Sequence, residues 1–480
     1  MGGINPFVES KFARRNVMKK SVLRLIVVGV LAAVMLTGCG GKNGDSDGGK
    51  STTKDVKEDS PKTAEVDKKT AEDTGSKDKV TINYYDWVNL DTSIIDDFNA
   101  ANPDIKVVYH MIPDNGSDKL TQLDVLAMGG GEIDVMPGSD GEQMLRMKNG
   151  IYAPLDEFIK KDGIDMEANF GDILDYARYD GVYYGYPYRS TVEGIWYNKD
   201  MFDEAGIPYP DGLWTWDEYI DIARKLTKGE GQDKIYGTYT HTFNGQWAPI
   251  GNEVSDWYTE DGKCNIKAEG FIKALETRKK LDDEGIQLSF NQIIATKATQ
   301  SAYFLGGKCA MVQAGSWIVQ NIKDQENYPH DFKIGVAPLP RYDENVKENN
   351  NFCVAASILA IPANSEHKEE AWRFIRYIVE EGAKRTAGIG NYPSYKPSYN
   401  DDLINTFIEG SNLEADDIKV IFGDLTTCTQ KPIGIGSAEY QQSMQEQTQL
   451  YFNGEKTIEE ITDTIEKVTN ESISKELNNK

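Results

Sequence analysis

Tryptophan rings and rigid polar side chains recur along this chain in a pattern that suits ligand binding. Rings can cover the apolar C–H faces of a ligand, while carboxylates, amides and a guanidinium can hydrogen-bond to hydroxyl groups at its edges. Sugars present both kinds of surface, and buried hydrogen bonds and rings would supply affinity and orientation. The candidate face residues are Trp87, Trp247 and Trp317, and the candidate edge residues are Asp140, Glu142, Arg189 and Asn391.

Structural interpretations compete with these assignments. Any one of these tryptophans is as often a core residue as a ligand contact, because most aromatic area in proteins is buried. Arg189 could instead form an ion pair between two lobes, and Asp140 could cap a helix. Trp196 stands inside a hydrophobic strand, and Trp214 and Trp216 flank a helix start, so we assign these three to the core.

Enzymatic and metal-binding functions find little support in the sequence. Carboxylates are abundant but form no recognisable catalytic motif, and the separation of a glycosidase pair, about 5 to 9.5 Å, cannot be derived from sequence. A hydrolase or lyase acting on extracellular glycans is therefore a less favoured alternative. The chain has 4 histidines and no clustered ligand set, so we expect no metal and no cofactor.

The first 38 residues have the features of an export signal. Basic residues between positions 19 and 24 precede an apolar run, Leu25 to Leu36, that is too short for a membrane span. The run leads into the sequence LTGC at residues 36–39, which closely resembles the lipobox of bacterial lipoproteins. The resemblance implies cleavage before Cys39 and a diacylglycerol on its sulfur; the alternative is an ordinary cleavage site with a coincidental cysteine. Met18 begins a complete signal by itself, so translation could start there rather than at Met1.

A polar segment separates this signal from the patterned part of the chain. Residues 40–79 contain no aromatic side chain and are dominated by Gly, Ser, Thr, Lys, Asp and Glu. Such a segment cannot bury enough apolar surface to offset the entropy of ordering, so we predict a disordered tether. As a flexible coil of about 40 residues it would span roughly 35 Å r.m.s..

The formal charge and the cysteines narrow the possible partners. The net charge is −25, and loss of the first 38 residues, with six basic residues and one acidic residue, would make it −30. Such a chain repels nucleic acid and anionic lipid surfaces but accepts either a neutral or a cationic ligand.

The four cysteines after Cys39 lack the spacing of a zinc site, and the sequence leaves open whether they are buried thiols or form disulfides: Cys264, Cys309, Cys353 and Cys428.

Strand and helix patterns alternate from Val80 onward. The periodicity predicts strands from residue 80, over 105–111 and over 133–136, with helices over 93–101 and 119–128. This order indicates an open, mainly parallel α/β sheet. Ligands of such sheets collect at the carboxyl ends of strands, which puts Trp87, Asn89 and the loop Ser139–Glu142 on one rim.

The stretch Tyr179–Pro208 is expected to connect two lobes. An Asp180-Gly181 turn leads into one aromatic strand, and a second strand ends at Asn198, where a helix opens. The polar segment Arg189–Glu193 between them would cross to the second lobe and form the floor of a ligand cleft. We therefore expect Arg189→Ala to weaken binding while leaving the melting curve nearly unchanged.

Later segments add further expectations. Thr215-Trp216-Asp217-Glu218 is a capping box that would begin a helix over 216–226. The irregular segment around Asn244 and Trp247 could be a loop facing a cleft, and Gly315-Ser316-Trp317 would let the backbone come near a ligand. The segment Gly388–Pro397, punctuated by glycine and proline, indicates another crossing between lobes.

Taken in order, these segments resemble the type 1 extracellular solute-binding proteins, the maltose-binding-protein-like carbohydrate receptors of ABC importers. The most specific block is YNKDMF at 197–202, with AGIP at 205–208 and TWDE at 215–218. The resemblance covers about residues 80 to 470 and includes further motifs. They are IIDDF and NPDIKV within 94–107, GIYAPL at 150–155, the run from Phe304 to Trp317, and AWRF at 371–374.

The resemblance implies a two-lobed α/β fold of the periplasmic-binding-protein type II class, with hinge strands and a central cleft that closes on a sugar. It would make 1–38 the signal peptide, 39–79 the lipidated cysteine and tether, 80–188 and 341–389 the first lobe, and 189–340 and 390–480 the second. By position it puts Trp87, Asn89 and the loop 139–142 on the first lobe's rim. The crossing and the second lobe would then supply the other contacts: Arg189, Thr191, Trp247, Trp317 and Tyr440, with Gly388–Tyr392 as the later hinge. Relatives often have an aromatic residue in the third-strand loop where this chain has Gly138, so no specific sugar can be transferred.

Residues and resemblance together predict a monomeric receptor, lipid-anchored through Cys39 on the extracellular face of a bacterial cell membrane. It would capture a carbohydrate, an oligosaccharide by expectation, and deliver it to the permease of an ABC importer without catalysing a reaction. One alternative is a receptor for a cationic or other non-sugar solute, which Asp140, Glu142 and the negative charge would favour. Another is a sensory lipoprotein that partners a membrane kinase.

Overall fold

The structure is a computed structural model that describes residues 79–87, 90–113, 117–129, 132–139, 142–210, 213–345, 352–423 and 425–478. The predicted signal peptide, Cys39 and the tether lie outside the described residues. So do Asn89, Asp140 and the side chain of Glu142. None of the described helices combines the length and apolar character needed to cross a bilayer.

The first elements agree closely with the periodicity of the sequence. Strand β1 (Val80–Asp86) pairs in parallel with β2 (Ile105–Met111), from Val80 opposite Ile105 to Asp86 opposite Met111. Helix α2 (Ser93–Ala101) connects them and buries Ile94, Ile95 and Phe98, the residues at helical spacing. After α3 (Ser117–Met128), the chain forms a parallel bridge between Val135 and Tyr84 before β3 (Met136–Gly138).

One long strand, β6 (Tyr186–Asn198), occupies the place where two strands were expected. Its first half pairs antiparallel with β9 (Phe352–Ala360) and with β10 (Tyr392–Pro393). Its second half pairs antiparallel with β7 (Met311–Gly315) and β8 (Ile334–Pro338). The polar residues between 189 and 193 do not interrupt the strand, because β7 and β8 replace β9 and β10 as pairing partners there, with a register shift between Thr191 and Val192.

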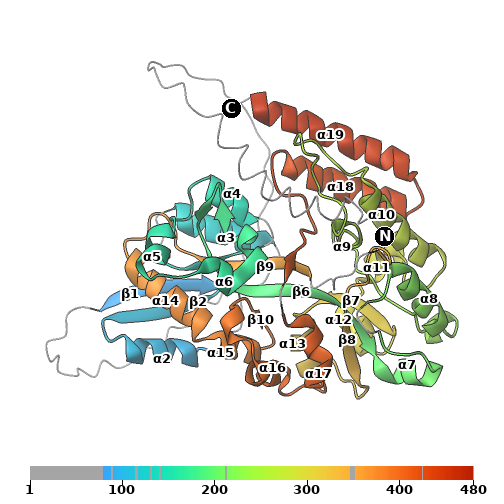
Figure 1. The fold of residues 1–480 in the computed structure, drawn as a ribbon, viewed down its shortest axis with the longest axis horizontal. Helices are drawn as coiled ribbons and strands as arrows, with labels where there is room; N and C mark the ends of the chain where they lie inside the picture. Colours follow the sequence, from blue (N-terminus) through green and yellow to red (C-terminus); the bar gives the residue numbers. More distant parts are fainter. Residues whose placement is uncertain are drawn as a thin grey trace, which may run out of the picture. The chain divides into compact units, whose positions relative to one another are not determined.

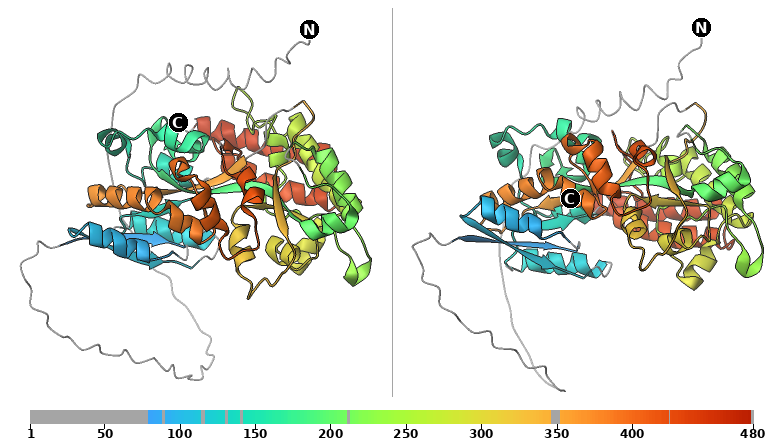
Figure 2. Two further views of the ribbon diagram at one scale, coloured as in Figure 1. Left: turned by 60° about the horizontal axis from the view of Figure 1, so that its bottom comes forward. Right: turned by 90° about the horizontal axis from the view of Figure 1, so that it is seen from below.

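Figure 1 shows β6 running from the elements around β1, β2 and α14 (Lys368–Glu380) toward those around β7 and β8. The further views in Figure 2 keep the blue N-terminal strands and the yellow β7–β8 region toward opposite ends of this strand. Strand β9 also pairs antiparallel with β3 and in parallel with β11 (Thr426–Thr427). The three segments on which the expectation of a parallel sheet rested do pair in parallel, β1 with β2 along their whole length and Val135 with Tyr84. The sequence did not predict that β6 pairs antiparallel with all its described neighbours.

The predicted local signals around β6 are confirmed. Asp180 and Gly181 both have positive φ, 50° and 80°, and form the two-residue turn between β4 (Arg178–Tyr179) and β5 (Val182–Tyr183). The capping box of Thr215 and Glu218 opens a helix, α8, over the predicted range Trp216–Leu226. Trp196, Trp214 and Trp216 are buried, as their assignment to the core predicted.

The remaining helices fill in the chain around these strands. In order along the chain, the α-helices not yet bounded are α4 (Glu142–Lys148), α5 (Asp156–Lys161), α6 (Met166–Phe170), α7 (Lys199–Ala205), α9 (Pro249–Asn252), α10 (Glu269–Asp283), α11 (Phe290–Thr296), α12 (Gln300–Leu305), α13 (Ile318–Lys323), α15 (Ala383–Gly388), α16 (Asp401–Ile408), α17 (Ala415–Ile418), α18 (Ser437–Phe452) and α19 (Ile458–Asn478). Short 3₁₀ turns are η2 (Gly171–Tyr176), η3 (Gly231–Asp233), η4 (Lys396–Ser398) and η5 (Lys419–Ile421).

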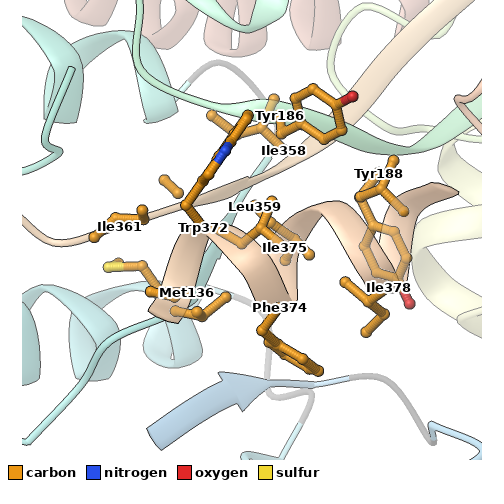
Figure 3. Packing of buried hydrophobic residues seen from close by; sticks show 14 of the residues in the cluster. Met136, Tyr186, Tyr188, Ile358, Leu359, Ile361, Trp372, Phe374, Ile375 and Ile378 are labelled. Carbon is orange, nitrogen blue, oxygen red and sulfur yellow. The ribbon is translucent and has the colours of Figure 1, made fainter. Parts of the chain in front are cut away.

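Three clusters of buried apolar side chains form the core. The first joins residues 82–188 to 356–379, where α14 packs Trp372, Phe374 and Ile375 against the sheet. Figure 3 shows Trp372 on the side of the helix that faces Tyr186 and Ile358, whereas Phe374 points to the opposite side, toward the blue strand β1. The second and third clusters draw on residues after 191, including Trp216 and Phe271 in one and Trp196 and Phe304 in the other.

This distribution of cores supports the predicted lobe boundaries, which stay a prediction. Along β6, Tyr188 is the last residue that belongs to the first cluster. The third and second clusters start further along the same strand, at Val192 and Ile195. Tyr392 and helices α16 and α17 pack with the third cluster, and α18 and α19 pack with the second. Cys264 and Cys309 are buried thiols, and burial raises the pKa of Cys309 far above its usual value.

Candidate functional site

A pocket of about 410 Å³ lies over the middle of β6. Its walls come from the end of β1, from β9, from the β7–α13 turn and from the segment that leads into β10. The lining residues are Trp87, Arg189, Ser190, Thr191, Ser316, Trp317, Gln320, Ser357, Ile389, Asn391 and Tyr392. The structure thus brings together five residues that the sequence suggested separately: Trp87, Arg189, Thr191, Trp317 and Asn391.

Asp86, at the end of β1, fixes the position of Arg189. Arg189 Nη2 donates to both carboxylate oxygens of Asp86 at 3.3 Å, and the two side chains are 8% and 1% exposed. The same carboxylate accepts hydrogen bonds from the hydroxyl of Tyr84 and the backbone N–H of Trp87, each at 2.7 Å. Arg189 therefore lines the pocket and also ties β1 to β6.

The ion pair explains how Arg189 keeps its charge at a buried position. Burial is the largest single effect and lowers the pKa of Arg189, but Asp86 together with the neighbouring tyrosines acts in the opposite direction, and the net direction is upward. The guanidinium carbon also lies 5.9 Å from the centre of the Trp87 ring and 4.8 Å from that of Tyr188. This geometry contradicts the expectation that Arg189→Ala would leave the melting curve unchanged, because that change would strand a buried carboxylate.

The β7–α13 turn is held to β6 by paired hydrogen bonds. The backbone N–H of Ser316 donates to the Val192 carbonyl at 2.8 Å, and the Val192 N–H donates to Ser316 Oγ at 3.2 Å. On the other side of β6, the hydroxyls of Ser190 and Ser394 are 2.8 Å apart. These contacts fix the position of the turn that carries Trp317. The half-buried ring of Trp317 packs on the third core cluster.

Gly315 is required for this placement of Trp317. A Cβ at position 315 would lie 2.4 Å from Thr191 Cγ2 and 2.6 Å from Trp317 Nε1, so one of the two pocket residues would have to move. We expect Gly315→Ala to weaken ligand binding about tenfold, because displacement of a ring by about 1 Å costs much of its contact. Titration calorimetry checks this, with Gly307→Ala, which has open space around it but a φ of +68°, as a control for backbone strain outside the pocket. Unchanged affinity in Gly315→Ala would contradict the role given to Trp317.

Gln320 and Asn391 form the third wall. Gln320 Nε2 donates to Asn391 Oδ1 at 2.9 Å, across the boundary between α13 and the segment before β10. Gly390 has a φ of +77°, and a Cβ there would approach the Gln320 backbone nitrogen to 3.0 Å. Within the described part of the chain, Asn391 Nδ2 has no hydrogen-bond partner, so it is a donor that can bond to a ligand hydroxyl.

Three of the sequence-predicted residues lie away from this pocket. Trp247 is buried among Trp257 and Phe271, with ring centres 5.9 and 6.2 Å away. Tyr440 is fully buried and its hydroxyl donates to the Trp257 carbonyl. Asn244 lines a second, smaller cavity together with Trp247, and its Nδ2 donates to the Gln441 carbonyl. Trp247 and Tyr440 are therefore core residues here, since their rings are used by the packing of one lobe.

The sequence missed several pocket residues. Gln320 stands three residues after Trp317, a spacing that puts both on one helical face, and this signal could have identified it. Ser357 is a hydroxyl residue in the otherwise mostly apolar strand β9, which is a weaker signal. Asp86 could be identified only once β1 and β6 were known to meet.

A buried carboxylate lies on β6 just beyond the pocket. Glu193 is 3% exposed and accepts a hydrogen bond from Gln246 Nε2. Burial raises the pKa of Glu193 to about 7, although the hydrogen bonds from Gln246 and Gln313 act in the opposite direction. Near neutral pH this group therefore changes its charge at the strand that joins the two predicted lobes.

Glu193 makes the stability of the protein depend on pH. Since its pKa in the folded protein is above the ordinary value of about 4.5, its stabilising contribution is fully present below pH 4.5 and is lost as pH rises through 7. The loss amounts to about 3 kcal/mol of unfolding free energy. We expect Glu193→Gln to flatten this dependence and to be more stable than the unmodified protein at pH 8. Urea unfolding between pH 4.5 and 8 measures it, with the exposed Glu471→Gln as control; parallel curves for the Glu193 variant and the unmodified protein would refute it.

Comparison with known proteins agrees with this architecture. The model of the bacterial extracellular solute-binding protein family matches residues 88–385. The multiple sugar-binding protein of Streptococcus mutans is 27% identical over 330 residues, which cover 63% of this chain and 71% of that protein.

Two solved structures share the fold. A sugar transporter from Rhizobium etli in an open conformation superposes with a TM-score of 0.70 at 22% identity, covering 82% of this chain and 99% of its own. An ABC substrate-binding protein from Listeria monocytogenes in complex with cycloalternan gives 0.68 at 22% identity, covering 83% and 100%. The predicted two-lobed binding-protein fold is thereby confirmed. Given the family match over residues 88–385, this chain belongs to the bacterial extracellular solute-binding proteins, which are binding proteins rather than enzymes.

Proposed function

We propose that this protein captures a neutral carbohydrate, preferably an oligosaccharide, in the pocket over β6 and delivers it to the permease of an ABC importer. The observation that carries the proposal is the pairing of two indole rings, Trp87 and Trp317, with neutral hydroxyl and amide side chains around one floor. Rings suit the C–H faces of a sugar, and hydroxyls, amides and Arg189 suit its edges. The names of the relatives support it: one is a multiple sugar-binding protein and one was solved with cycloalternan.

The alternative of a cationic solute has less support. No carboxylate is among the described residues that line the pocket, and the buried carboxylate of Asp86, which contacts the lining residue Arg189, is already paired with it. A cation placed there would meet a guanidinium rather than an anion, which is unfavourable at short distance in a partly buried site.

Calorimetric titration separates these two functions. The protein is titrated with neutral oligosaccharides of different linkage and with spermidine as the cationic comparison. Saturable heat from at least one oligosaccharide, at micromolar affinity or tighter, is expected, with none from spermidine. Heat from spermidine alone would reject the carbohydrate proposal. Incubation of the tightest oligosaccharide with the protein should release no shorter product, as a binding protein requires.

Lobe closure is the proposed means of capture. The distribution of the cores on either side of residues 189–191 supports a hinge within β6, with further hinge segments near Pro340 and Gly390. Small-angle scattering should show a smaller radius of gyration when the oligosaccharide is added. An unchanged radius at saturating ligand would argue against closure.

Attachment to the outer face of the cell membrane through Cys39 belongs to the same proposal. The LTGC sequence at residues 36–39 and the polar segment after it support a lipid anchor with a spacer. Cys39→Ser is expected to move the protein from the membrane fraction to the medium and to abolish labelling by radioactive palmitate. Retention of both properties in this variant would reject the anchor.

A further inference from the structure

A second cavity is lined by a buried cation, Arg278, whose two terminal nitrogens have no hydrogen-bond partner among the described residues. The cavity has a volume of about 150 Å³ and shares no lining residue with the pocket over β6. Its floor is Arg278 of α10, which is 2% exposed. Neither Nη1 nor Nη2 of Arg278 has a hydrogen-bond partner within the described part of the chain.

The nearest anion compensates this arginine poorly. Asp282, one helical turn along α10, has its Oδ1 3.5 Å from Arg278 Nη1, which is an ion pair without a hydrogen bond. The Asp282 oxygens instead accept from Gln287 Nε2 at 2.7 Å and from the Phe290 backbone N–H at 3.1 Å. Burial lowers the pKa of Arg278 even though Asp282 acts to raise it, yet a guanidinium stays protonated at neutral pH. A buried donor fork of this kind is costly unless something accepts its hydrogen bonds.

The remaining walls favour an anion with a small apolar body. Phe290 and Phe452 are almost fully buried, and the Phe452 ring centre lies 5.9 Å from the Arg278 guanidinium carbon. Gln445 and Gln449 of α18 are exposed at the rim and offer amide donors. No described residue that lines the cavity carries a carboxylate.

His241 adds a neutral donor rather than a second charge. Its Nδ1 accepts the Phe243 backbone N–H at 3.0 Å, so the proton of the neutral ring sits on Nε2. Burial and the neighbouring charge of Arg278 lower the pKa of His241, which keeps the ring neutral at physiological pH.

We propose that this cavity is a binding site for a small oxyanion, a short organic carboxylate or inorganic phosphate, held by the Arg278 guanidinium. Its volume suits about six non-hydrogen atoms, since a cavity of roughly this size accommodates benzene. The carboxylate or phosphate oxygens accept from Nη1 and Nη2 in the bidentate manner that guanidinium groups favour. The site is independent of the sugar pocket and of the function proposed for it.

Thermal melting of the full protein at constant ionic strength tests the proposal. Propionate and inorganic phosphate are titrated separately against sodium chloride, so that the two sources of an oxyanion are distinguished. We expect a saturable rise in melting temperature with at least one of them. No rise beyond that produced by chloride would overturn the proposal.

Variants locate the effect. Gln449→Glu places a carboxylate at the rim without altering a buried group, and we expect at least tenfold weaker anion binding. Gln442→Glu makes the same charge change at an exposed position of α18 outside the cavity and should bind normally. Arg278→Met should abolish the saturable rise, with Lys280→Met, exposed on the same helix, as its control. Arg278→Met also leaves the Asp282 carboxylate without its ion-pair partner and could fold poorly. In that case the Gln449→Glu variant still tests the site. Equal anion responses in Gln449→Glu and Gln442→Glu would overturn the site.

Discussion

Trp317→Ala is expected to weaken oligosaccharide binding roughly 30- to 150-fold. The ring of Trp317 lines the pocket at the start of α13, and the hydrogen bonds between Ser316 and Val192 hold the turn that carries it. Loss of an aromatic face that a ligand covers costs about 2 to 3 kcal/mol of binding free energy. The ring is only half-buried in the unliganded protein, so the melting temperature should change little.

Calorimetry on Trp317→Ala and on Trp317→Phe measures this effect. The phenylalanine variant keeps a smaller ring at the same position and should retain most of the affinity. If Trp317→Ala bound the sugar as tightly as the unmodified protein, the ring would not be a ligand contact. A matched loss of thermal stability would instead assign Trp317 to the core.

Arg189→Met is expected to reduce both binding and stability. Removal of the guanidinium leaves Asp86 buried, and breaking one partner out of a buried ion pair typically costs about 3 to 5 kcal/mol of unfolding free energy. The pocket also loses its one described cationic side chain, which can donate several hydrogen bonds to sugar hydroxyls.

The double variant Asp86→Asn with Arg189→Met separates the two effects. It removes the stranded charge, so much of the lost stability should return while the affinity for sugar stays low. Urea unfolding measures the stability, and calorimetry measures the affinity for sugar, of the unmodified protein, Arg189→Met and the double variant. A double variant no more stable than Arg189→Met would show that Asp86 is not the source of the destabilisation.

The sequence predicted most local elements because their signals are local. Helix α8 opens at its capping box, α2 buries the apolar residues at helical spacing, and the Asp180-Gly181 turn has the expected backbone. The sequence could not predict that β6 is continuous. Its polar residues, such as Ser190 and Glu193, are buried by partners from distant segments, and only those partners make a polar strand tolerable.

The residues of the candidate site also fall into two groups, those that the sequence could identify and those that only the tertiary structure reveals. Trp87, Arg189 and Trp317 were found from residue type and position, and the structure brings them to one pocket. Trp247 and Tyr440 were chosen on the same grounds but face the interior of a single lobe, because the residue type of an aromatic does not say which way it points. The Asp86–Arg189 pair needed two strands whose meeting is a tertiary property, over a sequence distance of 103 residues.

Crystals grown with the tightest oligosaccharide test the central claim most directly. Electron density for sugar rings is expected over β6, with C–H faces against Trp87 and Trp317 and hydroxyls within hydrogen-bond distance of Arg189 and Asn391. Sugar density at another place on the protein, with the pocket over β6 filled only by water, would contradict the account.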